Sequence, residues 1–411
     1  MKRIIQKNLS CGMPLIIEPN LGVRSVGVSL LLPAGHVREP DALEGLGALW
    51  SELLLRGAGT LDSRAQADAF DRLGASRAAS AGTYHMHLSM TILGENLHDA
   101  LGLLADMVLA PRMDDPSIEA ARDLALQALA SLDDDPQQKA FLGARARHRP
   151  SPLNRSGLGT EQTLKAMTSK DLHEQWRRFA VPGGAVIALA GAVDPDAVET
   201  RLNALFDNWS GTVDDLPLEL IGPRGYAHET DDTNQVQVVV VHDAPAEADD
   251  NAWLERVVIS ILSGGMSSRL FTEVREKRGL CYSVNASYKT SRESGAVTAY
   301  VGTTPERAQQ SLDVLMAELH RISQGVDAGE FARAVTGLKS QLVFSGESTS
   351  ARAAALASDM ARIGRPRALD ELADRIDRIT LDEVNHYLAR RRIGRVTIQT
   401  LGPAPLVPPL D

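Results

Sequence analysis

The pattern of apolar and polar positions in the first half of the chain predicts a sheet with helices packed on it. From residue 85 to residue 92, polar side chains occupy the odd positions and apolar side chains the even ones, as in a strand with one buried face. Residues 26–32 read VGVSLLL, a near-continuous apolar run suited to the interior of a sheet. Further strands are expected over Met13–Glu18 and Ala185–Ala190.

Segments with helical spacing separate these strands. Apolar residues recur every three or four positions in Glu44–Leu54, Leu97–Leu109 and Ser169–Phe179. Three more helices are expected: one from Asp62 or Ser63 to Gly74, one over Ser117–Leu132 with a cap from Asp115-Pro116, and one after Asp194-Pro195. Strands and helices in this order are typical of an α/β sandwich within the α+β class.

The second half repeats this order of elements after an interruption. Residues 211–232 are rich in Gly, Pro and Asp, which is typical of a linker. Beyond them we expect strands over Val236–Val241, Cys281–Tyr288 and Ala296–Val301, and helices over Asn251–Leu262, Ser268–Lys277 and Thr304–Ile322. We therefore predict an internal duplication, with an N-terminal α/β domain over 1–210 and a C-terminal one over 233–411. Two such copies suggest a clamshell with a cavity between the halves.

The composition narrows the class of protein. A chain of 411 residues with 44% hydrophobic residues can bury two cores. Its net charge of −10 argues against nonspecific nucleic-acid binding, which needs clustered positive charge. Cys11 and Cys281 are the only cysteines, too few for a disulfide framework or a thiolate zinc site. Because neither an apolar run of roughly 18 residues nor a signal-peptide pattern is present, we expect a cytoplasmic protein without membrane association.

Five stretches of the chain carry a family resemblance. They are AGHVREP at 34–40, ENLHDALGLLADMVLAPR at 95–112, GTEQTLKAMTSKDL at 159–172, GGMSSRLFTEVREKRGLCYSV at 264–284 and GES at 346–348. In register, they resemble the pitrilysin/insulinase-type zinc metallopeptidases, in particular the small bacterial branch that is similar to processing-peptidase subunits. The resemblance covers nearly the whole chain. It implies two α/β sandwiches that enclose a chamber in which unfolded peptides are cut.

Active members of that family carry HxxEH in the first helix of the N-terminal half. Two histidines four residues apart share a helix face and bind zinc, and the glutamate before the second one acts as general base. In this chain Ala48, Ser51 and Glu52 stand where His, Glu and His are expected. The region that resembles that of the third ligand has Gln127 and Ala128. We therefore predict a degenerate metal motif and no zinc bound by this chain.

Two other groups of residues are candidate metal ligands. His36 and Glu39 have His-x-x-Glu spacing, but Pro40 follows them and the segment reads as a loop. His85 and His87 share one face of a predicted strand, with neither an acidic residue nor a third imidazole nearby in sequence. Because a catalytic zinc needs three protein ligands, we expect a polar, non-ligating role for both groups.

The C-terminal half keeps two residues suited to catalysis. Arg275 lies near the end of a predicted helix and Tyr282 at the start of the next strand, so their side chains can project the same way. Their spacing resembles that of the Arg/Tyr pair with which the family reaches the substrate at the zinc. Such donors can hold a peptide carbonyl and stabilise an oxyanion. The alternative is structural, with Arg275 in an ion pair with Glu273 or Glu276 and the tyrosine packed under the helix.

The loop before that predicted helix contains Gly264, Gly265 and Ser267. Glycines before a serine-capped helix can bind an anion through free N–H groups, but the Lys-Ser/Thr ending of a phosphate loop is missing. A tight connection between two helices is one interpretation. The resemblance implies the other, in which the loop borders the substrate chamber.

Together these features predict a noncatalytic subunit of a heterodimeric zinc metallopeptidase. A homologous, HxxEH-bearing partner would bring the zinc and the base, and this chain would bring Arg275, Tyr282 and part of the chamber wall. One alternative is a non-hydrolytic peptide-binding or structural scaffold of the same fold, comparable to the core subunits of respiratory complexes. Another is a homodimeric enzyme with unrecognised chemistry. An Arg/Tyr pair beside a lost metal motif favours the peptidase subunit, because a scaffold needs neither residue.

Overall fold

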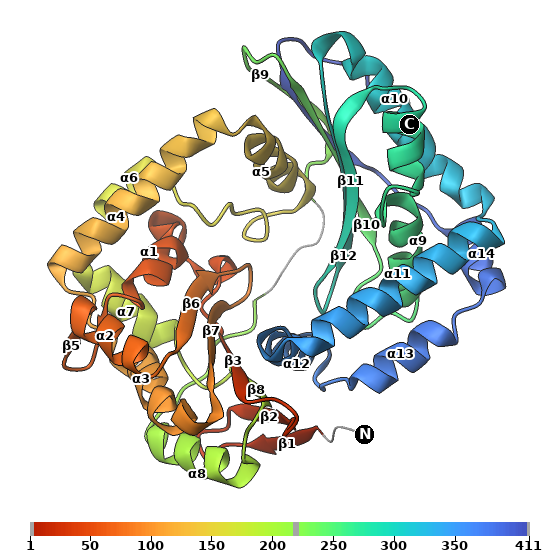
Figure 1. Cartoon of the computed structure of the whole chain (residues 1–411). Coiled ribbons are helices and arrows are strands. Elements are labelled where there is room, and N and C mark those ends of the chain that lie inside the picture. The colour runs from red at the N-terminus through yellow and green to blue at the C-terminus, as the bar shows by residue number, and fades with distance from the viewer. Residues whose placement is uncertain (1–3, 217–221, 409–411) are drawn as a thin grey trace. The chain divides into compact units, whose positions relative to one another are not determined.

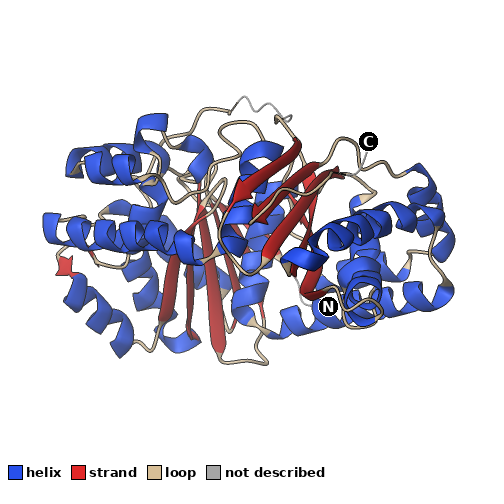
Figure 2. Ribbon diagram, turned by 90° about the horizontal axis from the view of Figure 1, so that it is seen from above, coloured by secondary structure: helices blue, strands red, loops and turns tan. Residues whose placement is uncertain are grey.

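The computed structural model describes residues 4–216 and 222–408, which form two compact units that each contain one large sheet (Figures 1 and 2). Unit 1 consists of Met1–Ser131, Arg155–Leu218 and Phe344–Ala368, and unit 2 of Leu132–Asn154, Glu219–Val343 and Leu369–Asp411. Each unit therefore combines segments from both halves of the sequence. Among the described residues, no helix is both long enough and apolar enough to cross a membrane.

The sheet of unit 1 has six strands, and its central strands are buried on both faces. Their order is β1 (Ile5–Asn8), β2 (Pro14–Pro19), β8 (Val186–Gly191), β3 (Ser25–Leu32), β7 (Met86–Leu93) and β6 (Ser76–Ala81). β2 and β8 run parallel, and the other neighbours are antiparallel. As predicted, β7 alternates between buried and half-buried positions up to residue 92.

Helices from the N-terminal half of the sequence cover one face of this sheet. They are α1 (Leu46–Leu53), α2 (Ser63–Arg72), α3 (Leu97–Leu109), α4 (Asp115–Ala130), α6 (Glu161–Ala166), α7 (Ser169–Phe179) and α8 (Pro195–Leu205), with a small ribbon of β4 (Gly57–Ala58) and β5 (Leu61–Asp62). The rings of Trp50 in α1 and Trp176 in α7 pack edge to face in the core, with 5.3 Å between their centroids. One cap differs from the prediction. Asp114 accepts the N–H of Ser117 at 3.1 Å, so α4 begins two residues before the predicted start.

A helix from the other half of the sequence covers the second face of the unit 1 sheet. It is α12 (Thr349–Ile363), whose residues Ala353, Leu356 and Ala357 pack against β2 and β8. Arg352 of α12 and Glu18 of β2, both almost fully buried, form an ion pair at 2.7 Å. A paired buried charge fixes position more than it adds stability, so this pair anchors α12 on the sheet.

The sheet of unit 2 has five strands in the order β11 (Cys281–Thr290), β12 (Gly295–Thr303), β10 (Val236–Ala244), β13 (Thr397–Gly402) and β9 (Gly225–Thr230). β9 lies within the stretch that was expected to be a linker. It is a strand because it pairs in parallel with β13. Residues 217–221 of that stretch lie outside the described residues. The helices are α9 (Ala252–Ser263), α10 (Ala308–Arg321), α11 (Ala328–Glu347), α13 (Leu369–Asp377), α14 (Leu381–Arg390) and α5 (Pro136–His148).

The two sheets share one topology. The order β2-β8-β3-β7-β6 of unit 1 corresponds to β9-β13-β10-β12-β11 of unit 2, and in each case only the first pair is parallel. Each sheet is also covered by one helix from the other half of the sequence. α5 packs on β10 and β13 through Ala140 and Ala144, and α12 packs on the equivalent strands β3 and β8. The predicted α+β class with two related α/β sandwiches is confirmed. The clamshell arrangement stays a prediction.

Candidate functional site

Helix α1 places the three degenerate metal-motif positions on one half-buried face, since residues three and four apart stack on a helix. Ala48 packs against the core of unit 1. The hydroxyl of Ser51 donates to the carbonyl of Gly47 at 2.7 Å. Glu52 lies 3.6 Å from the guanidinium of Arg56. All three side chains therefore have ordinary structural partners.

The positions expected for the third metal ligand lie on α4, which packs against α1. Gln127 and Ala128 are both exposed there, and neither supplies a carboxylate. Across residues 4–216 and 222–408, no three histidine, cysteine, aspartate or glutamate side chains are grouped so that they could hold a metal ion. The described residues therefore do not fit a catalytic zinc, which needs three protein ligands.

His36 and Glu39 form a buried structural pair beside α1. The two side chains approach to 3.2 Å, and His36 Nε2 lies 3.1 Å from the carbonyl oxygen of Ala81. The carboxylate of Glu39 accepts the N–H groups of Gly45 at 2.9 Å and Gly47 at 2.8 Å. A carboxylate at this point satisfies N–H groups that a helix start leaves unpaired. The pair therefore stabilises the start of α1.

His85 and His87 are held neutral at pH 7. Burial lowers the pKa of His87, whose Nε2 lies 2.9 Å from Ser29 Oγ. Burial, together with the positive charges of Arg38 and Arg362, lowers the pKa of His85 to about 4. The surroundings of His85 are thus cationic, unlike those of a metal-binding imidazole, which usually has a carboxylate beside it.

In unit 2, Arg275 lies on a π-helical turn, η5 (Phe271–Glu276). The N–H of Lys277 donates to the carbonyl of Thr272 at 2.9 Å, five residues back, where the sequence pattern predicted an α-helix. Gly279, at φ +60°, then closes the turn by donating to the carbonyl of Arg275 at 2.9 Å. Single π turns are frequent at functional sites because they displace one side chain from the regular helix face.

Tyr282 occupies a β-bulge at the start of β11. The pairing of β11 with β12 shifts by one residue between Cys281 and Ser283, which leaves Tyr282 as the extra residue. Bulges redirect side chains and occur often beside active sites. The tyrosine is 78% exposed, and no described residue forms a hydrogen bond with its hydroxyl. The alternative in which it packs under the helix is therefore wrong.

The guanidinium of Arg275 is also without an ionic partner among the described residues. It lies 5.0 Å from the ring centroid of Phe271. Burial raises the pKa of Cys281 to about 11, and the positive charge of Arg275 acts in the opposite direction. The guanidinium therefore lies near Cys281, the residue that precedes Tyr282. Arg275 thus lies near the start of β11, the strand that carries Tyr282.

Glu273, one of the carboxylates considered as a partner for Arg275, is engaged elsewhere. Its oxygens lie 2.7 Å from Lys277, 2.7 Å from Arg278 and 3.6 Å from Arg321. Hydrogen bonds from Lys277 and Arg278 lower its pKa to about 2. The predicted alternative of an ion pair between Arg275 and this glutamate is therefore wrong.

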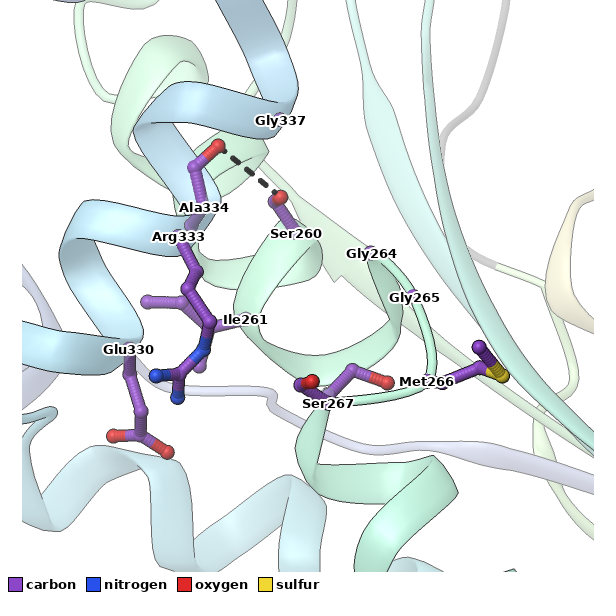
Figure 3. A pocket seen from close by; sticks show the side chains of 11 residues that line it. Ser260, Ile261, Gly264, Gly265, Met266, Ser267, Glu330, Arg333, Ala334 and Gly337 are labelled. Carbon is purple, nitrogen blue, oxygen red and sulfur yellow. Dashed lines mark hydrogen bonds between the residues drawn. The ribbon is translucent and has the colours of Figure 1, made fainter.

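The glycine loop forms one wall of a pocket of about 210 Å³, and α11 forms the other (Figure 3). The N–H of Gly264 donates to the carbonyl of Ser260 at 2.7 Å and so ends α9. A Cβ at Gly264 would lie 2.3 Å from that carbonyl oxygen, so a residue with a side chain would clash at this position. Gly265 and Ser267 are exposed beyond it. The loop is thus a tight helix connection and a pocket wall at once.

Sequence reasoning missed the opposite wall of this pocket. Glu330, Arg333, Ala334 and Gly337 line it from α11, at the spacing of three and four that marks one helix face. That spacing is visible in the sequence. Nothing local, however, connects these residues with a loop more than 60 positions earlier.

Comparisons with known families and proteins agree with the resemblance. The sequence model described as insulinase (peptidase family M16) matches residues 15–160, and the one described as peptidase M16 inactive domain matches residues 166–338. A protein of Mycobacterium leprae named an uncharacterized zinc protease is 27% identical, over 96% of this chain and 91% of its own length. A Bacillus subtilis protein, also named an uncharacterized zinc protease, is 24% identical over 92% of this chain and 94% of its own.

Solved structures share the fold at low sequence identity. A peptidase M16 inactive domain from Pseudomonas fluorescens has a TM-score of 0.89 and 20% identity, and the match covers 99% of this chain and 100% of that one. A protease from Helicobacter pylori gives 0.84 and 16%, with 98% and 100% covered. A chain of complex III from Candida albicans gives 0.80 and 17%, with 97% and 96% covered.

Proposed function

Because the chain belongs to the insulinase family of peptidases (peptidase M16), we propose that it is a noncatalytic subunit of a heterodimeric zinc metallopeptidase. A homologous partner carrying HxxEH would supply the metal and the general base. This chain would supply Arg275 and Tyr282 to the bound peptide. The zinc would belong to the partner, and this chain would bind none.

One contrast supports the proposal. Arg275 and Tyr282 expose polar groups that form no hydrogen bond or ion pair with the described residues, whereas the side chains at the metal-motif positions of α1 all have structural partners. Exposed donors that have no hydrogen-bond acceptor in the described chain are available to a ligand. The side chains at the metal-motif positions are already engaged by the protein and are not available in this way.

The chemistry of these two residues suits peptide hydrolysis. A guanidinium and a phenol are hydrogen-bond donors. When water attacks a peptide carbonyl, negative charge builds on the carbonyl oxygen, and donors aimed at that oxygen lower the barrier. The π turn and the bulge hold Arg275 and Tyr282 on two different elements that pack together, η5 and β11. In this proposal their donor groups approach one carbonyl oxygen from these two elements.

Purification with and without the partner tests the proposal. The chain alone should contain no stoichiometric zinc and cleave no unfolded peptide. Mixing it with the HxxEH-bearing homologue should give a complex with one zinc that cleaves such peptides. Stoichiometric zinc in the isolated chain, or a partner that is equally active without this chain, would contradict the proposal.

A second candidate is a peptide-binding or structural scaffold without hydrolysis. The shared fold of a chain from complex III favours it. A scaffold has no use for exposed donors at Arg275 and Tyr282. Under this alternative, the mixed complex would form but would cleave nothing.

A further inference from the structure

The pocket between the glycine loop and α11 is lined by one guanidinium that forms no direct ion pair with a described residue. Its one carboxylate, Glu330, is fully engaged by Arg269, with Nε and Nη2 at 2.6 and 2.7 Å from the two carboxylate oxygens. Arg333, one turn further along α11, also lines the pocket, and no described carboxylate lies within ion-pairing distance of it. The N–H of Glu330, which donates to Asp327 at 2.8 Å, lowers the pKa of that carboxyl, and the charges of Arg333 and Arg269 lower it as well. Arg333 therefore has the carboxylate of Asp327 nearby, but it forms no direct ion pair in the pocket.

The other wall supplies neutral donors and an apolar edge. In Figure 3 the side chain of Arg333 extends from α11 alongside Glu330, and Ser267 lies on the glycine loop that forms the other wall. The hydroxyl of Ser267 has no partner among the described residues, and nothing lies within 4 Å of a Cβ built on Gly265, so a ligand meets the backbone there without obstruction. Met266 is 76% exposed at the rim. A charged end and an apolar rim suit a side chain with a short aliphatic stem and an anionic head.

The size of the pocket limits the ligand. Cavities that hold whole small molecules measure roughly 300–1,000 Å³, and this one has about 210 Å³. It therefore suits one side chain. We propose that the pocket binds the carboxylate of an aspartate or glutamate in an extended peptide, with Arg333 as the charged partner and Ser267 as a donor. This inference rests on the proposed function in taking a peptide as the ligand, but it requires neither zinc nor a partner.

The test compares three fluorescent decapeptides that differ at one central position, which is glutamate, glutamine or phosphoserine. Fluorescence anisotropy with the isolated full chain should show the glutamate peptide binding about 5-fold tighter than the glutamine peptide, as for a charged hydrogen bond in a partly exposed site. Arg333→Gln should abolish the preference. Ser267→Ala should reduce it about 2-fold.

Arg292→Gln is the matched control. Arg292 is an exposed arginine of the same unit that lies outside the pocket, so its loss should leave the preference unchanged. Unchanged thermal unfolding of Arg333→Gln would show that the variant is folded, as expected for an exposed residue.

Four results would overturn the assignment. They are equal binding of the glutamate and glutamine peptides, an equal loss of preference in Arg292→Gln, no binding of any peptide at about 1 mM chain, and much tighter binding of the phosphoserine peptide. The last would reassign the pocket to phosphate. Because the assay uses the isolated chain, it separates the two proposals. A glutamate preference in a chain that never yields an active complex would refute the peptidase role alone.

Discussion

Helix α1 and the η5–β11 segment are the two regions where the family resemblance places chemistry, and they use their side chains in opposite ways. In α1, the hydroxyl of Ser51 bonds to its own helix and Glu52 faces Arg56. In η5 and β11, Arg275 and Tyr282 expose polar groups that form no hydrogen bond or ion pair with the described residues. The first region has become an ordinary helix. The second keeps irregular backbone, a π turn and a bulge, whose effect is to orient two exposed side chains.

The two half-sites are stabilised by separate sets of contacts. α1 is stabilised at its start by Glu39, so it needs no metal to hold its shape. η5 is stabilised by the cations around Glu273, and that network does not include Arg275. Either half-site can therefore change without disturbing the fold of the other, which is what a division of labour between two chains requires.

The largest expected effect is that of Arg275→Ala in the complex with the partner. Removing a donor to a developing oxyanion costs roughly 100- to 1,000-fold in kcat/KM. The thermal unfolding of the chain should not change, because the guanidinium has no ion pair to lose. Steady-state cleavage of an unfolded peptide measures the effect, with Arg292→Ala as the matched exposed control. Equal losses in both variants would remove the contrast between the two regions.

The next effect is a gain at α1. A variant with Ala48→His, Ser51→Glu, Glu52→His and Gln127→Glu restores both imidazoles, the base and a carboxylate on α4. Its zinc affinity should exceed that of the natural chain by at least about 100-fold, because each added ligand contributes to the binding free energy. Calorimetric titration measures it. Ser51→Glu alone adds no imidazole and should give no gain. No gain in the fourfold variant would show that α1 and α4 no longer have the geometry of the motif.

Tyr282→Phe should have a smaller effect on activity, about 10-fold in kcat/KM, since it removes one neutral hydrogen bond. The free energy of unfolding should change by less than about 0.5 kcal/mol. Tyr288 is the matched control in the same strand, because its hydroxyl donates to the carbonyl of Pro245 at 2.5 Å. Tyr288→Phe should lose about 1 kcal/mol of stability and keep its activity. The reverse outcome would assign the structural role to Tyr282.

The smallest effect concerns the support of η5. The folded-state pKa of Glu273 is lowered from 4.5 to about 2, so the stabilisation it provides is present above pH 4.5 and is lost as the pH falls toward 2. Glu273→Gln should cost about 1 kcal/mol at pH 7, as expected for ion pairs near the surface. The natural chain should approach the variant in stability between about pH 5 and pH 2. Denaturant unfolding at several pH values measures this, and a constant difference would refute the assignment.

The sequence pattern predicted the helices and strands in which buried and exposed positions alternate with a regular period. The amphipathic helices α3 and α7 match their predicted bounds. The exchanged helices α5 and α12 were not predicted, because each packs on a sheet from the other half of the sequence. Ala140 and Ala144 contact that sheet through small side chains that give little hydrophobic signal. β9 was missed for a similar reason, since its partner β13 lies far along the chain.

The candidate site was predictable where its chemistry is local. The degenerate motif on α1 follows from three positions on one helix face. The exposure of Tyr282 does not follow from sequence, because a one-residue bulge decides it and the surrounding pattern reads as a regular strand. Arg333 was missed because the fold, and no nearby residue, brings α11 to the glycine loop.

The most direct test of the division of labour measures zinc and cleavage on one sample. The complex of the partner with the Arg275→Ala/Tyr282→Phe chain should keep one zinc per heterodimer. Its kcat/KM should fall by at most about 1,000-fold, because the effects of residues that act together are not additive. Full cleavage by this complex would contradict the account, and so would the loss of its zinc.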